Sequence, residues 1–315
     1  MALFQHSHIV FASSRCGILQ VPPSLQTFEV RGTLEARNVA SEGKGNAWTE
    51  RSVDGMRIVT YNIFYGGQER IPLIAQILRN QNPDLVALQE ANDRSNAEQL
   101  AGALNMQLIF GESDSAFHVA WLSRLPVSRV RNYQLPILHK GPLTEFTTHK
   151  TLLSIDVQWN GSLLHLCTTH LQAGYPDEFE ECRLREIEVI LEEIQPIQGE
   201  PLLLVGDLNA FAPDDQVDSL PIGEEGFAEW RFIEQGKRLA IARLQEAGLV
   251  DCYRGLHPRQ AGYTCDARRR PSMRIDYCFA SPQLAQSLHS CEVINNELTA
   301  KASDHLPVQV EFTKK

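Results

Sequence analysis

The sequence predicts an α/β protein in which antiparallel or mixed sheets are covered by outer helices. Apolar runs typical of buried strands alternate with segments at helical spacing along the 315-residue chain. The dipeptide Asn160-Gly161 separates two strand-like segments and is the strongest hairpin signal in the chain. No regular β-α-β repeat is kept, which argues against a TIM barrel and a Rossmann fold.

Three strands and two helices are expected in the first half of the folded domain. The first expected helix has apolar residues at helical spacing over 71–80 and is stopped by Pro83. The second expected helix spans 96–104. The expected strands are short apolar runs at 56–61, 85–88 and 118–122.

The second half begins with the hairpin, whose expected strands are 152–159 and 162–169. A charged helix with apolar residues along one side is expected over 179–194. Another helix, over 239–247, ends at Gly248. The remaining expected strands are 201–205, 274–279 and 306–312.

Residues 1–55 are expected to be an extension and linker ahead of the folded domain at 56–315. Residues 1–28 contain Arg15 and no acidic residue, so they fit either an organelle-targeting peptide or an extension without a function. No apolar run approaches the ~20 residues that span a bilayer. Unless residues 1–28 are a targeting peptide, we expect a cytoplasmic protein, and we expect a monomer.

Charge and cysteine content restrict the classes of function. The formal net charge of −10 argues against tight, sequence-independent binding of duplex DNA, although it leaves room for a local basic groove. The seven cysteines include no CxxC pair, which argues against a zinc ribbon and a redox dithiol. We therefore expect reduced structural thiols.

Several apolar runs end in, or are preceded by, an acid, an amide or a histidine. Any one of these polar residues has an ordinary explanation, such as a turn former or a helix cap. A set of them suggests polar side chains gathered at one rim of rigid strands, which is a common way to build an active site. The residues are Asn62, Glu90, His170, Asp207, Asn209, Asp276, Asp304 and His305.

The side chains of this set are consistent with a metal-dependent reaction at a phosphoryl group. Clustered carboxylate and carboxamide oxygens select hard cations such as Mg²⁺ or Mn²⁺, and such a cation suits a phosphoryl oxygen. Histidines add hydrogen bonding and proton transfer near neutral pH. The chain has neither a GxxxxGK[ST] loop nor a GxSxG elbow, which excludes an NTP-binding P-loop and argues against a serine hydrolase.

Seven short motifs in this order resemble those of the endonuclease/exonuclease/phosphatase superfamily of DNase I-like phosphoesterases. They extend from about Met56 to Phe312. They are Thr60-Tyr61-Asn62, Leu88-Gln89-Glu90, Leu122-Ser123-Arg124, Thr169-His170-Leu171, Gly206-Asp207-Leu208-Asn209, Arg274-Ile275-Asp276-Tyr277 and Ser303-Asp304-His305. The resemblance implies a four-layer α/β sandwich of two packed mixed or antiparallel sheets flanked by helices, with the catalytic domain at 56–315.

The resemblance also implies a reaction, the attack of water on a phosphodiester or phosphomonoester with the help of Mg²⁺ or Mn²⁺. The implied metal ligands are Glu90, Asn62 and Asp304. The implied catalytic residues are Asp207, which orients or deprotonates the water, Asn209 on a phosphoryl oxygen, His305 with Asp276 holding its ring, and His170 at the scissile phosphate or leaving group.

The substrate is left open among a small molecule, a lipid headgroup and a nucleic acid. His118 is a candidate for an extra phosphate contact or for an ordinary strand residue. The arginines at 268–270 and Arg274 are either a clamp for an anionic substrate or part of a solvated loop. The stretch 211–236 is the expected loop for substrate choice. The alternatives are a nuclease of DNA or RNA, an inactive binding module, and a zinc enzyme, which the absence of HExxH-like spacing disfavours.

Overall fold

The computed structural model describes residues 55–135, 150–174, 177–217, 236–268 and 271–314. The N-terminal extension with its possible targeting peptide lies outside the described residues, as do most of the expected substrate loop and two of the three consecutive arginines. Among the helices that the structure describes, none is long and apolar enough to cross a membrane.

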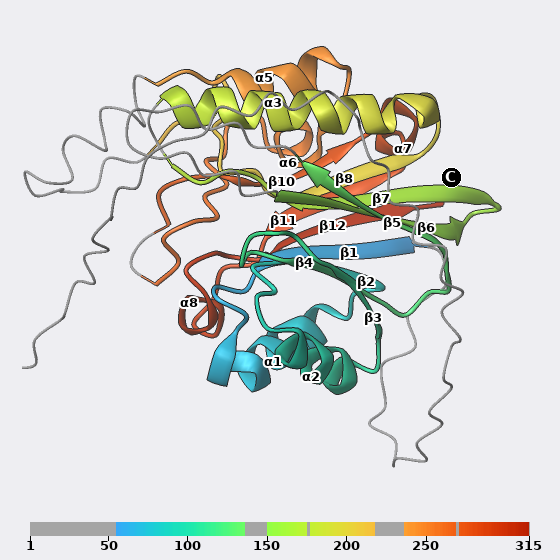
Figure 1. Cartoon of the computed structure of the whole chain (residues 1–315), viewed down its shortest axis with the longest axis vertical. Coiled ribbons are helices and arrows are strands. Elements are labelled where there is room, and N and C mark those ends of the chain that lie inside the picture. Colours follow the sequence, from blue (N-terminus) through green and yellow to red (C-terminus); the bar gives the residue numbers. More distant parts are fainter. Residues whose placement is uncertain (1–54, 136–149, 175–176, 218–235, 269–270, 315) are drawn as a thin grey trace, which may run out of the picture. The chain divides into compact units, whose positions relative to one another are not determined.

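Two six-stranded sheets form the centre of the domain (Figure 1). The first sheet has the strand order β11 (Leu288–Val293), β12 (Val308–Thr313), β1 (Gly55–Asn62), β2 (Leu85–Gln89), β4 (Val119–Ser123) and β3 (Gln107–Gly111). The second sheet has the order β5 (Val127–Leu135), β6 (Lys150–Trp159), β7 (Ser162–His170), β8 (Leu202–Asp207), β10 (Asp276–Ala280) and β9 (Val250–Asp251).

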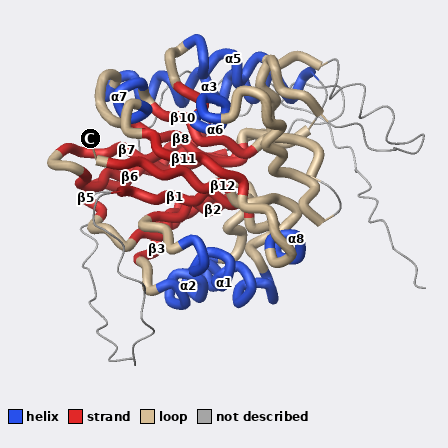
Figure 2. The backbone as a smooth tube through the Cα atoms, turned by 180° about the vertical axis from the view of Figure 1, so that it is seen from behind, coloured by secondary structure: helices blue, strands red, loops and turns tan. Residues whose placement is uncertain are grey.

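Helices cover the outer face of each sheet, so the domain has four layers (Figure 2). Helices α1 (Ile71–Gln81) and α2 (Arg94–Leu104) lie on the first sheet. Helices α3 (Asp177–Ile194) and α5 (Leu239–Glu246) lie on the second sheet. The predicted four-layer sandwich is confirmed. The short helices are η1 (Gln68–Arg70), η2 (Gln195–Ile197), α6 (Cys252–Leu256), α7 (Pro282–Ala285) and α8 (Thr299–Ala302).

Three apolar cores hold the layers together. The central core lies between the sheets and contains fully buried side chains such as Trp121, Ile155 and Phe312. Ile74 and Leu78 of α1 pack on one sheet, and Ile187 and Ile190 of α3 pack on the other. The apolar spacing that predicts these helices therefore marks the sides that they bury.

The predicted element ends have local causes that the structure makes visible. Asp93 caps α2 by accepting hydrogen bonds from the Ser95 and Asn96 N–H groups. The hairpin turn uses Asn160 at φ 54° and Gly161 at φ 78°, as a turn with two left-handed residues requires.

Each sheet contains one parallel pair, and all other neighbours are antiparallel. Strands β1 and β2 are parallel and joined through α1, and β7 and β8 are parallel and joined through α3. The carboxyl ends of each parallel pair therefore lie at the same edge of its sheet. The antiparallel neighbours start at that edge, since Asp276 of β10 lies opposite Asp207 and Val308 of β12 lies opposite Thr60. This topology places the predicted polar residues together.

Gly206 lets β8 approach β7 directly before Asp207. Its φ is +148°, and a Cβ added there would lie 2.0 Å from the Thr169 carbonyl oxygen. Residues other than glycine rarely adopt this backbone conformation, and here the strand pairing leaves no space for a side chain.

We predict that Gly206→Ala lowers the free energy of unfolding by more than about 3 kcal/mol, because backbone strain and a steric overlap with β7 add together. Urea unfolding followed by circular dichroism measures this change. The control is Gly102→Ala on the exposed side of α2, where no atom lies within 4 Å of the added Cβ. It should leave stability equal or raise it by up to ~1 kcal/mol. Equal stability of both variants would contradict the account of Gly206.

Candidate functional site

The side-chain amide of Asn62 connects two carboxylates that come from different sheets. Its Nδ2 donates to Glu90 Oε1 at 3.2 Å and to Asp207 Oδ2 at 2.9 Å. Asn62 ends β1, Glu90 directly follows β2, and Asp207 ends β8. The polar ends of these strands therefore meet at one edge, as the sequence predicts.

Glu90 is fixed by the loop that follows β1. Its Oε2 accepts the N–H of Tyr65 at 2.7 Å, and its backbone oxygen accepts the N–H of Gly66 at 2.7 Å. Glu90 itself has a φ of 52°, which turns the chain out of the sheet directly after β2. The half-buried carboxylate is therefore held in place by neighbouring backbone.

Asp207 is almost completely buried, at 1% exposure. Its Oδ1 accepts the N–H of Asn209 at 3.0 Å. Burial raises the pKa of Asp207 to about 7, although the positive charge of His305 and the amide of Asn62 act in the opposite direction. A carboxyl group with this pKa can hold or release a proton near neutral pH.

His305 lies between two carboxylates. Its Nδ1 is 2.8 Å from Asp276 Oδ2, and its Nε2 is 3.7 Å from Asp207 Oδ2. Burial alone would lower the pKa of His305, but the charges of Asp276 and Asp207 outweigh it and raise the pKa well above the ordinary value. His305 is therefore a cation at neutral pH.

His170 has the opposite electrostatic setting. Its Nε2 is 3.5 Å from Asp207 Oδ2, and its buried Nδ1 has no hydrogen-bond partner among the described residues. Burial lowers the pKa of His170 well below the ordinary value, and the charges of Lys150 and His305 lower it further. His170 is therefore neutral at neutral pH, although it faces the same carboxylate as His305.

Ser303 joins the last predicted motif to β1. Its hydroxyl donates to the backbone oxygen of Asn62 at 2.7 Å and accepts the N–H of His305 at 3.2 Å. These bonds fix the positions of Asp304 and His305 relative to the end of β1. Ser303 belongs to a motif named from the sequence, but its positioning role is visible only in the structure.

Glu90, Asn62 and Asp304, the metal ligands that the sequence predicts, carry the oxygen atoms that a hard divalent cation prefers. Each Glu90 side-chain oxygen accepts one hydrogen bond from the described residues, which leaves further lone pairs on each oxygen. The Asp304 carboxylate is half-buried beside Ser303, and all three residues offer oxygen atoms. Such a set suits Mg²⁺ or Mn²⁺ better than a soft metal.

Asp207, Asp276 and His305 also lie close enough to resemble a metal site, since one ligand-type atom of each is within 4.8 Å of the others. However, both ring nitrogens of His305 face carboxylate oxygens, which suits two N–H donors of a protonated ring. A metal ligand would need an unprotonated nitrogen. We therefore interpret this cluster as a charged, hydrogen-bonded chain.

His118 and Asn209 lie beside these groups. The backbone oxygen of His118 accepts the N–H of Ala91, directly after Glu90, at 2.9 Å. Its Nδ1 accepts the Ser113 N–H at 3.1 Å, so a neutral ring carries its proton on Nε2. Asn209 donates its amide to the Leu171 oxygen at 3.1 Å, which ties it to the residue after His170.

Arg274 is buried in an ion-pair cluster, in contrast to its predicted role as a substrate clamp. Its Nε and Nη2 donate to Asp215 at 2.8 and 3.1 Å, and its Nη1 lies 2.7 Å from Asp251. The guanidinium is 2% exposed and packs over the ring of Tyr277. These contacts leave it no surface for a substrate, so we do not include Arg274 in the site.

Arg268, the one described residue of the three consecutive arginines, is exposed and lies over the ring of Phe64.

Lys150 is a buried cation that the sequence analysis missed. It begins β6 and is 4% exposed, and burial lowers its pKa although the charges of Glu186, Asp207 and Glu90 oppose this. The signal was present in the sequence. The hairpin is antiparallel, so the start of its first strand must lie at the edge where its second strand ends in His170.

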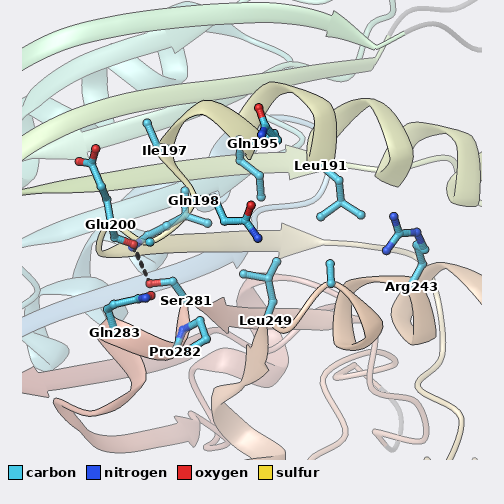
Figure 3. A pocket seen from close by; sticks show the side chains of 14 residues that line it. Leu191, Gln195, Ile197, Gln198, Glu200, Arg243, Leu249, Ser281, Pro282 and Gln283 are labelled. Atoms are coloured by element: carbon cyan, nitrogen blue, oxygen red, sulfur yellow. Dashed lines mark hydrogen bonds between the residues drawn. The ribbon is translucent and has the colours of Figure 1, made fainter.

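A pocket between α3, α5 and the start of β8 is lined by described residues (Figure 3). It has a volume of about 510 Å³ and is lined by Leu191, Leu249 and Pro282 together with Gln198 and Arg243. Leu202, where β8 starts, also lines it, whereas the polar cluster lies where β8 ends at Asp207. The pocket is therefore separate from the candidate site.

Comparisons with known proteins find one family and a set of similar folds. The sequence model of the Endonuclease/Exonuclease/phosphatase family matches residues 59–305. Over 148 residues the chain is 28% identical to a DNA-(apurinic or apyrimidinic site) endonuclease of Arabidopsis thaliana, which covers 40% of this chain and 41% of that relative. The chain thus matches less than half of the length of this curated relative.

Solved structures of the same fold include two proteins that match across their whole length. An AP endonuclease from Archaeoglobus fulgidus has a TM-score of 0.61 at 20% identity, covering 82% of this chain and 99% of that chain. A 3′ phosphatase from Neisseria bound to a product DNA hairpin has a TM-score of 0.60 at 22% identity, covering 82% and 100%. At these identities the likeness concerns the fold.

The buried position of Arg274 gives a prediction that separates a structural role from a substrate contact. Arg274→Met should lower the free energy of unfolding by ~3–5 kcal/mol, because Asp251 would remain buried without an ion-pair partner and Asp215 would keep only Arg254. The control is Arg243→Met, which removes an exposed ion pair with Glu188 and should cost less than ~1 kcal/mol. Urea unfolding measures both changes. If Arg274→Met instead keeps wild-type stability and raises KM, the predicted role of Arg274 in binding the substrate would be supported.

Proposed function

The chain belongs to the endonuclease/exonuclease/phosphatase family, and on this premise we propose that it is a Mg²⁺- or Mn²⁺-dependent hydrolase of phosphodiesters. Cleavage of a phosphoester bond by water is the chemistry of this family. The observation that carries the proposal is the setting of Asp207, a buried carboxyl group with a pKa of about 7 that contacts Asn62 and faces two histidines. This setting suits a base that acts on water near neutral pH.

Glu90, Asn62 and Asp304 would hold the metal ion. When bound, the ion would supply a Lewis acid that neutralises charge on a phosphoryl oxygen. Without a cation, Glu90 and Asp207 would be two carboxylates separated only by the Asn62 amide. A divalent cation beside them would reduce this repulsion.

We assign the attacking water to Asp207, which orients the water and accepts its proton. His305 carries a positive charge toward the same place and stabilises the negative charge that develops on the phosphate, with Asp276 holding its ring. We assign to Asn209 a hydrogen bond to a phosphoryl oxygen, donated by the amide N–H that does not bind Leu171. His118 has an Nε2–H donor available for a second phosphate contact.

His170 is assigned to the scissile phosphate or the leaving group. As a neutral ring facing Asp207, it can donate only one N–H, and the contact with Asp207 suggests that Nε2 carries it. Its low pKa argues against a role as the main cationic stabiliser, which leaves that role to His305.

A nucleic acid is the favoured class of substrate, because proteins with this fold include an AP endonuclease and a 3′ phosphatase bound to a DNA hairpin. The small-molecule and lipid-headgroup alternatives remain outcomes of the assays. An inactive binding module is disfavoured because Glu90, Asp207 and His305 are all present and contact one another directly or through Asn62.

We predict that the wild-type protein hydrolyses bis(p-nitrophenyl) phosphate or a single-stranded oligonucleotide in Mg²⁺ or Mn²⁺ and loses this activity in EDTA. Asp207→Asn should lower turnover by about 10²–10⁴-fold, because the amide cannot accept a proton from water. Its thermal unfolding should stay close to wild type, which separates lost chemistry from lost folding. Near-normal turnover of Asp207→Asn would refute the catalytic role of Asp207. Hydrolysis that continues in EDTA would refute the proposed requirement for a metal ion.

The pH dependence of turnover should be bell-shaped. Asp207 acts as its anion, so activity should rise as the pH increases through an apparent pKa near 7. His305 acts as its cation, so activity should fall again at a pH above its raised pKa. Because the two groups interact, the two limbs report the pair together. Initial rates at saturating substrate between pH 5 and 10 measure the profile, and a rate that falls steadily from pH 5 to 8 would contradict it.

A further inference from the structure

Three aromatic side chains form a row at the mouth of the candidate site, and we call this row the aromatic ledge. It consists of Phe64, Tyr65 and Phe117. The ring centroids of Phe64 and Tyr65 are 4.7 Å apart, and those of Tyr65 and Phe117 are 6.2 Å apart. The ring of Phe117 meets His170 edge-on at 5.7 Å. The ledge therefore ends at a side chain that contacts the catalytic carboxylate.

Tyr65 is the exposed member of the ledge. Its side chain is 51% exposed, although it lies beside a site whose polar groups are largely buried. Phe64 and Tyr65 have φ values of 54° and 50°, a left-handed conformation that is rare for bulky residues. Such strain persists where surrounding contacts determine it, and it is concentrated at functional sites.

The contacts that fix Tyr65 are visible. Its N–H donates to Glu90, and the guanidinium of Arg70 donates to the backbone oxygens of Ile63 and Phe64. Arg70 also donates to the oxygen of Ala302, close to the last catalytic motif. The ring is thus presented at a fixed place next to the proposed metal ligand, which limits the entropy lost when a ligand binds.

Cations occupy the ends of the ledge. Lys150 Nζ lies 4.7 Å from the centroid of Phe117, and the guanidinium of Arg268 lies 4.4 Å from that of Phe64. Among the described residues, no cation lies over the ring of Tyr65. An aromatic face between two cations suits a ligand that is both anionic and planar.

We propose that Tyr65 stacks on an unpaired nucleobase next to the scissile phosphate, so that the enzyme prefers single-stranded or frayed nucleic acid. This inference rests on the proposed phosphodiesterase function. A base within a duplex has both faces covered by its neighbours and could not stack on Tyr65. A choline headgroup also binds aromatic rings, but Lys150 and Arg268 would repel its positive charge.

The test measures binding separately from catalysis. The Asp207→Asn protein is titrated, in Mg²⁺, into a fluorescent single strand of eight thymidines and into a strand of the same length built from abasic spacers. We expect the thymidine strand to bind more tightly. Adding Tyr65→Ala should weaken thymidine binding about tenfold and spacer binding less than twofold. Tyr65→Phe should restore thymidine binding, because stacking needs the ring and not the hydroxyl group.

Two outcomes would overturn the proposal. One is an equal loss of affinity for both strands in Tyr65→Ala with unchanged thermal unfolding, since the ring would then not act on the bases. The other is a preference for a phosphocholine diester or for blunt duplex DNA over the thymidine strand. Val130→Ala, on the exposed edge strand β5, is the matched surface control and should change neither affinity. If the wild-type protein hydrolyses no phosphodiester while these affinities behave as expected, the proposed function fails and the stacking site stands.

Discussion

The site depends on one amide group that holds two carboxylates together, one of them half-buried and the other buried. The Asn62 Nδ2 donates to Glu90 of one sheet and to Asp207 of the other. Two negative charges held this close inside a protein repel each other strongly. The amide reduces that repulsion without adding charge, and in the proposed function a divalent cation would reduce it further. Asn62 thus links the packing of the sheets to the chemistry at their edge.

A second buried link strengthens this junction. Gln89 is fully buried, accepts a hydrogen bond from Thr60 and donates to Thr168 of β7 at 3.0 Å. It joins the same two sheets one residue before Glu90. The side chains to which we assign catalytic roles are therefore carried by strands whose relative position is fixed by polar contacts as well as by the apolar core. Such rigidity suits a site that works by placing charges in advance.

The two histidines show how surroundings decide a role that residue type leaves open. His305 has carboxylates at both ring nitrogens and is charged. His170 faces one carboxylate, and the positive charges of Lys150 and His305 lower its pKa. Both are buried, so the difference comes from the arrangement of neighbouring charges. One ring can therefore stabilise a negative charge while the other supplies a neutral hydrogen bond.

The sequence predicts the central strands, the main helices and the set of polar residues at the rim, because these depend on apolar periodicity and on strand ends. It does not reveal β3, β5, β9 and β11, all of which lie near or at sheet edges, where one side faces solvent or another element and the apolar pattern fades. Arg274 shows a different limit, because a charged residue beside a motif looks the same whether it meets a substrate or a buried aspartate. The loop at Tyr65 could not be foreseen, since aromatic residues rarely adopt left-handed backbone angles.

The position of β12 has a consequence for biosynthesis. Strand β1 lies inside its sheet, between β2 and β12, so the first described strand needs the last one as a neighbour. While the ribosome is still making the chain, one edge of β1 has unpaired backbone groups. These groups can pair with a wrong strand or be bound by chaperones. His305 also emerges only just before β12. A nascent chain that stops before His305 therefore lacks one of the residues to which we assign a role in hydrolysis, and its β1 lacks a neighbour on one side.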